Sequence, residues 1–201
     1  MKRITADNIK VAAKLLKEGK IVAFPTETVY GLGVVFDSGE AFHNLVGVKQ
    51  RKPDKPFTLM CGSITEIEKY AEVNEKAKKI IANFLPGELT IILNTKPHVP
   101  SWVDLGTGHI GIRVPNDKLV TDMIRLVGKP LLVPSANRAD KPPLTIDQDV
   151  IKEFGNEISG IVLGQSKGAT PSTVIAAYDR IIMLREGNLR FNEITKVIGG
   201  D

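Results

Sequence analysis

Residues 25–33, with the sequence PTETVYGLG, place hydroxyl, carboxylate and phenol side chains beside two glycines. They follow the apolar residues 21–24, which predict a short buried strand. In open α/β sheets ligands bind where strands deliver their loops, so this segment is a candidate binding loop. A purely structural polar turn is the alternative. The glycines match neither GxGxxG nor GxxxxGK[ST], which excludes a dinucleotide fingerprint and a Walker loop.

A cluster of cations lies at the end of a predicted helix, within residues 49–55. It consists of Lys49, Arg51, Lys52 and Lys55. Arg51 can hold a phosphate with two parallel hydrogen bonds, while the lysines act as point charges. The alternative is a solvated helix C-terminus, where cations complement the helix dipole.

Polar side chains also stand at the ends of four further predicted strands. They are Arg113, Ser135 with Asn137, Ser172 and Arg185. A site rich in arginine, lysine and hydroxyl groups, with few carboxylates, suits a polyphosphate or another anion.

Other kinds of site have little support in the sequence. His43, His98 and His109 lack the spacing of metal ligands, so we expect no protein metal site. Cys61 is the only cysteine, which excludes an intramolecular disulfide and predicts a small core residue.

The composition is that of a globular protein. Of 201 residues, 42% are hydrophobic and 25% are charged, and the formal net charge is +4. This modest excess permits an anionic partner without requiring one. No signal peptide or membrane-spanning segment is expected, so the predicted location is cytoplasmic. We expect one compact domain over residues 1–201.

Helical and strand patterns alternate along the chain. Helices are predicted over residues 7–18, 38–49, 74–84, 117–127, 148–154 and 193–198. A capping box at residues 63–66 predicts another helix start. Strands are predicted near residues 21–24, 57–61, 89–93, 110–114, 131–133, 161–163, 173–177 and 181–184. Late neighbouring strands lack intervening helices, so the fold class is α/β with a mixed sheet.

Taken in order, the polar segments resemble the threonylcarbamoyl-AMP synthase family of YrdC-like proteins. The matching strings are PTETVYGLG at 25–33, KxR at 49–51, PGELTIIL at 86–93, GIRVP at 111–115, SxN at 135–137, PSTVI at 171–175 and LREG at 184–187. The resemblance implies a twisted mixed β-sheet flanked by helices around a basic concave cleft. It also implies the short form of the family, without the extra C-terminal domain of longer members.

The resemblance implies a nucleotidyltransferase that joins L-threonine, bicarbonate and ATP into L-threonylcarbamoyladenylate and pyrophosphate, for threonylcarbamoyladenosine modification of tRNA. ATP is then a substrate, accompanied by Mg²⁺ bound through its phosphates. The implied partners are the tRNA threonylcarbamoyl-transfer complex and RNA itself. Two alternatives stay open: a double-stranded RNA-binding module, and the carbamoyltransferase-type domain of hydrogenase maturation.

The resemblance also assigns residues. The catalytic pair is Lys49 and Arg51. The ATP-binding residues are Arg51, Lys55, His109, Asn137, Thr145 and Arg185. The L-threonine-binding residues are Thr28, Met60, Arg113, Ser135 and Ser172. Three positions depart from the usual pattern: Lys52 replaces a proline, Met60 a histidine of many relatives, and His109 a threonine or serine.

Overall fold

The computed structural model describes residues 1–50 and 56–199. The strands are β1 (Lys2–Ile4), β2 (Val22–Phe24), β3 (Gly31–Val35), β4 (Leu59–Met60), β5 (Ala71–Glu72), β6 (Leu89–Thr95), β7 (His109–Arg113), β8 (Leu131–Leu132), β9 (Gly160–Val162), β10 (Thr173–Ala176) and β11 (Ile182–Arg185). The α-helices are α1 (Ile9–Lys17), α2 (Gly39–Lys49), α3 (Ile67–Tyr70), α4 (Glu75–Phe84), α5 (Ser101–Asp104), α6 (Lys118–Val127), α7 (Asp147–Phe154) and α8 (Phe191–Val197). The 3₁₀ helices η1 (Ala6–Asn8) and η2 (Ile64–Glu66) precede α1 and α3.

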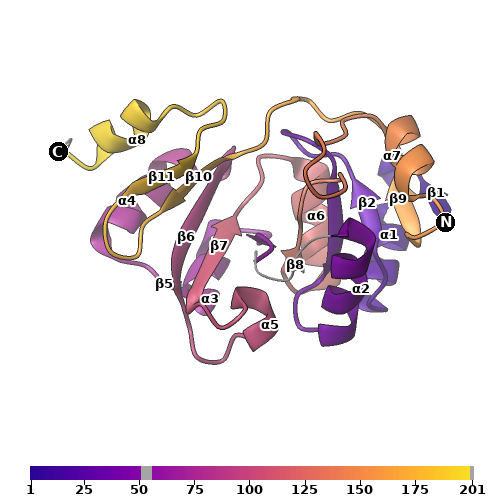
Figure 1. The fold of residues 1–201 in the computed structure, drawn as a ribbon, viewed down its shortest axis with the longest axis horizontal. Helices are drawn as coiled ribbons and strands as arrows, with labels where there is room; N and C mark the ends of the chain where they lie inside the picture. Colours follow the sequence, from indigo (N-terminus) through magenta and orange to yellow (C-terminus); the bar gives the residue numbers. More distant parts are fainter. Residues whose placement is uncertain (51–55, 200–201) are drawn as a thin grey trace.

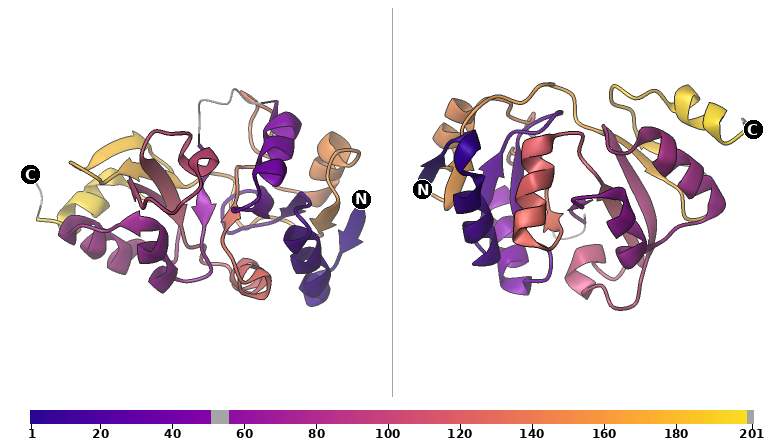
Figure 2. Two further views of the ribbon diagram at one scale, coloured as in Figure 1. Left: turned by 90° about the horizontal axis from the view of Figure 1, so that it is seen from below. Right: turned by 180° about the vertical axis from the view of Figure 1, so that it is seen from behind.

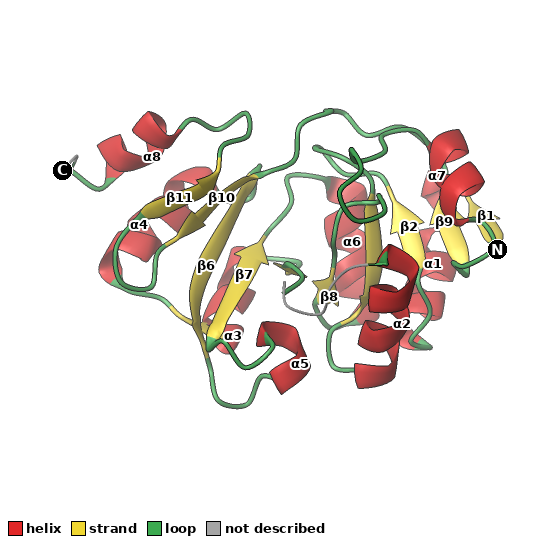
Figure 3. Ribbon diagram, in the orientation of Figure 1, coloured by secondary structure: helices red, strands yellow, loops and turns green. Residues whose placement is uncertain are grey.

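The strands form one twisted sheet in the order β1-β9-β2-β3-β8-β4-β7-β6-β10-β11, with β5 paired to β6. The sheet combines parallel pairs, such as β4 with β7, and antiparallel pairs, such as β6 with β7. The predicted mixed α/β sheet is therefore confirmed. Figure 1 shows the N-terminus and the C-terminus at opposite ends of the molecule, and Figure 3 shows helices beside the sheet in both halves.

Three helices begin at the side chains that the sequence places there. Ser38, Asn74 and Asp117 each accept a hydrogen bond from a backbone N–H three residues later, starting α2, α4 and α6. Such capping satisfies a donor that the helix itself leaves unpaired. The helices that carry or flank the site loops therefore start at positions fixed by local sequence.

Residues 63–66 begin a helix, as predicted, but the predicted capping box is not formed. The Ser63 hydroxyl bonds to the Thr65 hydroxyl at 2.9 Å, and no side chain caps η2 at Ser63. The Glu66 carboxylate instead accepts the N–H of Gly62 at 2.9 Å. In a capping box, Ser63 would bond to the Glu66 N–H and Glu66 to the Ser63 N–H. Ser63 bonds to Thr65 and Glu66 to Gly62 instead, and the first turn is a short 3₁₀ helix.

The second half of PTETVYGLG is a strand rather than a loop. Gly31 and Gly33 lie in β3, which is buried on both faces. A Cβ atom at Gly33 would meet the Phe24 ring at 2.6 Å, and one at Gly31 would meet Val133 at 2.6 Å. The two glycines therefore leave room for the Phe24 ring of β2 and for Val133, the residue directly after β8. The short strand β1, which pairs with β9, was also not predicted.

Apolar side chains fill both faces of the sheet. One cluster joins α1, α6 and β2 through residues such as Leu16, Phe24 and Met123. Figure 2 shows α1 and α6 side by side. The larger cluster packs α2, α4, α7 and α8 on the sheet and contains Cys61. Burial raises the pKa of the Cys61 thiol, as expected for a core cysteine.

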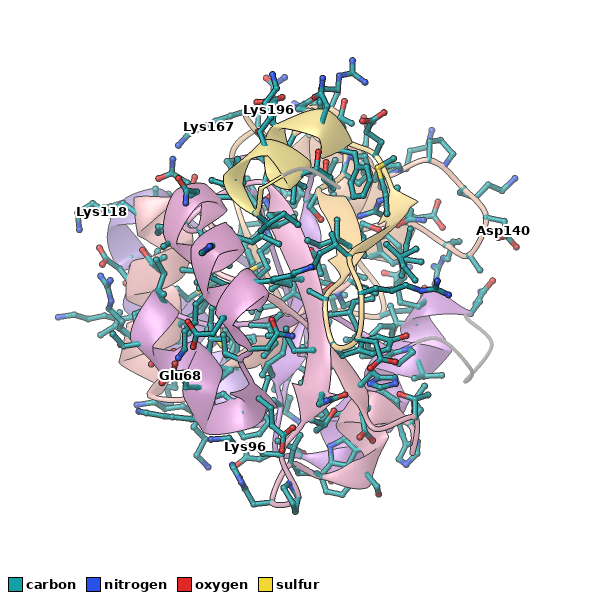
Figure 4. All side chains as sticks on the ribbon, turned by 90° about the vertical axis from the view of Figure 1, so that its left-hand side faces the viewer. Glu68, Lys96, Lys118, Asp140, Lys167 and Lys196 are labelled. Carbon is teal, nitrogen blue, oxygen red and sulfur yellow. The ribbon has the colours of Figure 1, made fainter. Side chains whose placement is uncertain are left out.

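Several lysines project from the outer surface. Figure 4 shows Lys118, Lys167 and Lys196 pointing outwards, and Lys118 and Lys167 have highly exposed side chains. In the described part of the chain, no helix combines the length and the apolar character that crossing a bilayer requires.

Candidate active site

A cavity of about 450 Å³ is lined by residues from both halves of the sheet, one half being β1, β9, β2, β3 and β8 and the other β4, β7, β6, β10 and β11. This volume is within the usual range for small-molecule sites. One wall comes from the loop after β2 and the loop after β8, and the other from β6, β7, β10 and β11. The predicted site residues in its lining are Thr28, Met60, His109, Arg113, Ser135, Ser172 and Arg185. All five residues assigned to L-threonine are therefore brought together, although they come from distant parts of the chain.

Arg113 is held from three sides. Its Nε donates to the Gly87 carbonyl at 3.1 Å, and its Nη1 donates to the Thr28 hydroxyl at 3.1 Å. Its Nη2 lies 2.8 Å from Oε1 of Glu27 in a buried ion pair. Apart from this ionic contact, Nη2 has no hydrogen-bond partner within residues 1–50 and 56–199. A guanidinium fixed in this way keeps N–H groups for a carboxylate.

Short hydroxyl groups line the cavity beside Arg113. The Thr28 hydroxyl bonds to that of Thr26 at 2.9 Å, and the Thr90 hydroxyl bonds to that of Ser172 at 2.9 Å. Both pairs are buried, and each hydroxyl can donate or accept. They can therefore adapt to either kind of polar group on a small ligand.

Two rings stack at one side of the cavity. The His109 and Tyr178 rings are nearly parallel, with centroids 3.8 Å apart and planes 8° apart. His109 begins β7, whereas Tyr178 follows β10. Both rings belong to the cavity lining and give this part of it an aromatic surface. Such a surface suits a planar ring.

Lys49 is buried rather than solvated, which excludes for this residue the alternative of a solvent-exposed helix end. Its ammonium group lies at the C-terminal end of α2. It donates to the Ser135 carbonyl at 2.6 Å, and to the carbonyl and side-chain oxygens of Asn137. Lys49 therefore ties α2 to the loop that carries Ser135.

Asn137 and Thr145 are not among the residues that line the cavity. The Asn137 amide donates to the carbonyls of Arg138 and Lys141 and accepts from Ser135, so it shapes its own loop. Thr145 accepts a backbone hydrogen bond from Ser166. Arg51 and Lys55 lie outside the described residues. The expected basic character of the cleft depends on them and stays a prediction.

Sequence reasoning assigned no role to Glu27, Thr90 or Tyr178. Glu27 lies inside the PTETVYGLG string, which marked its loop as a candidate binding loop. Nothing in the sequence indicated that its partner is Arg113. Thr90 is a buried polar residue within the apolar strand β6, and Tyr178 follows the end of β10. Their partners lie far away in the chain, and only the folded sheet brings them together.

A family model for Sua5, YciO and YrdC, described as "Telomere recombination", matches residues 14–187. The chain belongs to the Sua5/YciO/YrdC family. Two members of this family named threonylcarbamoyl-AMP synthase are similar to it. The Bacillus subtilis protein is 38% identical over 95% of this chain, and the Pyrococcus abyssi protein is 36% identical over 98%.

The structures of the Sua5/YciO/YrdC family agree with this fold. P. abyssi Sua5, solved in complex with L-threonine, has a TM-score of 0.93 and 34% identity over 98% of this chain. The chain spans 56% and 59% of the two curated relatives, and 60% of that solved chain.

Proposed function

We propose that the protein is an L-threonylcarbamoyladenylate synthase, with residues 1–201 forming one catalytic domain. The observation that carries the proposal is the convergence of Thr28, Met60, Arg113, Ser135 and Ser172 on one cavity. Family members named threonylcarbamoyl-AMP synthase, and the P. abyssi structure with L-threonine, support the same substrate.

The proposed reaction has two bond-forming steps. The neutral amine of threonine attacks bicarbonate and water leaves, which gives an N-carboxylate. An oxygen of this group then attacks the α-phosphorus of ATP, and pyrophosphate leaves. The nucleophile and the triphosphate are both anionic, so the site must offset their repulsion and hold them in line.

Arg113 binds the threonine carboxylate in this proposal, and the hydroxyls of Thr28, Ser135 and Ser172 surround the rest of the amino acid. Met60 supplies apolar contact near its methyl group. Buried charged and hydroxyl groups of this kind discriminate strongly, because a ligand that lacks the matching group leaves them unpaired.

The ATP side is proposed to include the stacked ring of His109, together with Asn137 and Thr145. Arg51, Lys55 and Arg185 hold phosphates, and Lys49 lies between nucleotide and N-carboxylate. Within residues 1–50 and 56–199, no three His, Cys, Asp or Glu side chains gather as metal ligands. Mg²⁺ is therefore proposed to be held mainly by phosphate oxygens and water.

The product is a mixed anhydride, which needs a prompt acceptor. We propose that it is handed to the tRNA threonylcarbamoyl-transfer complex in the cytoplasm. Direct contact with RNA belongs to the same proposal. Neither alternative function is favoured, because the relatives with 36–38% identity are named as synthases.

The test is pyrophosphate release by the purified protein. Release is expected only when L-threonine, bicarbonate and ATP are all present, and mass spectrometry should detect the adenylate. Equal release without threonine, or none with all three substrates, would contradict the proposal.

A further inference from the structure

The carboxylate of Glu27 lies behind the cavity rather than in its wall. Glu27 belongs to the loop between β2 and β3 and is only 7% exposed. It is not one of the cavity-lining residues, whereas its neighbours Thr26 and Thr28 are. Any influence of Glu27 on a ligand must therefore pass through a residue in the wall.

Both polar contacts that the Glu27 carboxylate makes within the described residues involve a single oxygen. Oε1 accepts the backbone N–H of Asn116 at 2.8 Å and lies 2.8 Å from Nη2 of Arg113. Oε2 is buried and has no hydrogen-bond partner in the described part of the chain. A buried carboxylate with an unpaired oxygen is costly. Despite this cost, the fold retains the Oε1 oxygen of Glu27 at a defined place beside the guanidinium.

The backbone defines that place. The Asn116 N–H comes from the segment directly after β7, the strand that carries Arg113. Glu27 thus joins the β2–β3 loop to the end of β7, and it holds Nη2 while Gly87 and Thr28 hold Nε and Nη1. Each of the three guanidinium nitrogens therefore contacts a different residue.

We propose that Glu27 is a positioning residue for L-threonine, and that it acts through the location of Oε1 rather than through its negative charge. This inference rests on the proposed function. A guanidinium already oriented for the substrate carboxylate loses less conformational freedom on binding. The charge of Glu27 works in the opposite direction, because a second carboxylate beside Arg113 repels that of the substrate.

Two conservative variants separate position from charge. Glu27→Gln keeps an oxygen where Oε1 stands and removes the charge. Glu27→Asp keeps the charge and withdraws the oxygen by one methylene. If position matters, the aspartate variant must bind threonine worse than the glutamine variant. If charge matters, the order is reversed.

The experiment is calorimetric titration of L-threonine, and of ATP alone, into each purified variant. We expect Glu27→Asp to raise the Kd for threonine at least tenfold and Glu27→Gln to change it by less than threefold. The Kd for ATP should change by less than twofold in both. Glu66→Gln and Glu66→Asp are matched controls, because Glu66 also accepts a backbone N–H but lies outside the cavity. They should leave both affinities unchanged.

A double variant tests the route through Arg113. In an Arg113→Lys background there is no guanidinium to orient, so Glu27→Asp should cause little further loss of threonine affinity. Equal losses in both backgrounds would overturn the inference, as would wild-type affinity in Glu27→Asp. If Glu27→Asp does not fold, a tenfold loss in Glu27→Gln would overturn it alone. Wild-type protein that does not bind threonine would instead remove the proposed function, and this inference with it.

Discussion

Arg113 makes buried protein contacts on one side and lines the cavity on the other. Its side chain is 6% exposed, and its contacts come from Gly87, Thr28 and Glu27. Because three anchors define its plane, the hydrogen-bond geometry that it offers is as important as its charge. A lysine can supply the charge but not the fork.

Arg113→Lys is therefore expected to weaken L-threonine binding by roughly 10–100-fold, which corresponds to about 1.5–3 kcal/mol for a charge-assisted hydrogen bond. The affinity for ATP alone should change little. Calorimetric titration of both ligands, with the thermal midpoint measured beside them, tests this. Equal losses for both ligands together with a lowered midpoint would show a structural role instead.

At the scale of single elements, helix α2 is fixed at both ends: a side chain caps its N-terminus, and its last residue, Lys49, is buried. Ser38 accepts the Ala41 N–H at 3.2 Å at its N-terminus, while Lys49 ties its C-terminus to the loop of Ser135. Ser38→Ala should lower the free energy of unfolding by about 1 kcal/mol, because one helix N–H loses its partner. Urea denaturation measures this loss. Threonine affinity should stay unchanged, and unchanged stability would contradict the prediction.

Helix α7 is joined to the same loop by Arg138. Arg138 forms ion pairs with Glu153 and Glu157 and lies over the Phe154 ring at 4.5 Å. Its hydrogen bond to Glu157 holds the pKa of that carboxyl below its ordinary value of 4.5. A lowered folded-state pKa adds stability above the unfolded value, and this stability is lost as the pH falls through the folded value.

Glu157→Gln should therefore lower the urea midpoint at pH 7, and the difference from wild type should shrink as the pH falls below about 4.5. Urea titrations from pH 7 to pH 3 measure it. A difference that stays constant over this range would assign the effect to packing rather than to the charge.

Local signals in the sequence predicted most of these elements, and apart from the capping box at residues 63–66 the failures argued here have a non-local cause. Ser38, Asn74 and Asp117 act within one helical turn, so their capping is visible in the chain itself. Gly33 is different, because its reason is the Phe24 ring on a neighbouring strand. PTETVYGLG supplies Thr28 to the cavity lining, but it also contains the start of β3, which was not predicted for the same reason.

The site follows the same rule. Four of the five residues assigned to threonine lie in the recognisable short strings, whereas Met60 was assigned by its position in the resemblance alone. The partner of Glu27 and the partner of Tyr178 could not be predicted, since each pair forms across the folded sheet.

At the scale of the whole molecule, the cavity is shared by the two halves of the sheet. The loops near Thr28 and Ser135 face residues of β6, β7 and β10 across it. A ligand bound there contacts both halves, so it stabilises the folded chain as a unit.

L-threonine at a hundred times its Kd should thus stabilise the protein by about 2.7 kcal/mol. L-valine has the same shape but lacks the hydroxyl, so it leaves polar groups of the site unpaired and should stabilise less. Thermal midpoints measured with each amino acid at equal concentration test this. Equal shifts for the two would contradict the proposed threonine pocket.

The buried thiol at the centre of the sheet allows local opening of the fold to be measured by chemical labelling. Cys61 donates its backbone N–H to the Arg113 carbonyl at 2.9 Å, directly beside the site. Alkylating reagents attack the thiolate, which burial both shields and disfavours. Since the sequence has no other cysteine, each modified molecule records one opening of the sheet at this strand. The rate of labelling therefore reports how often this strand opens and how long it stays open, and a ligand that contacts both halves of the sheet is expected to slow it.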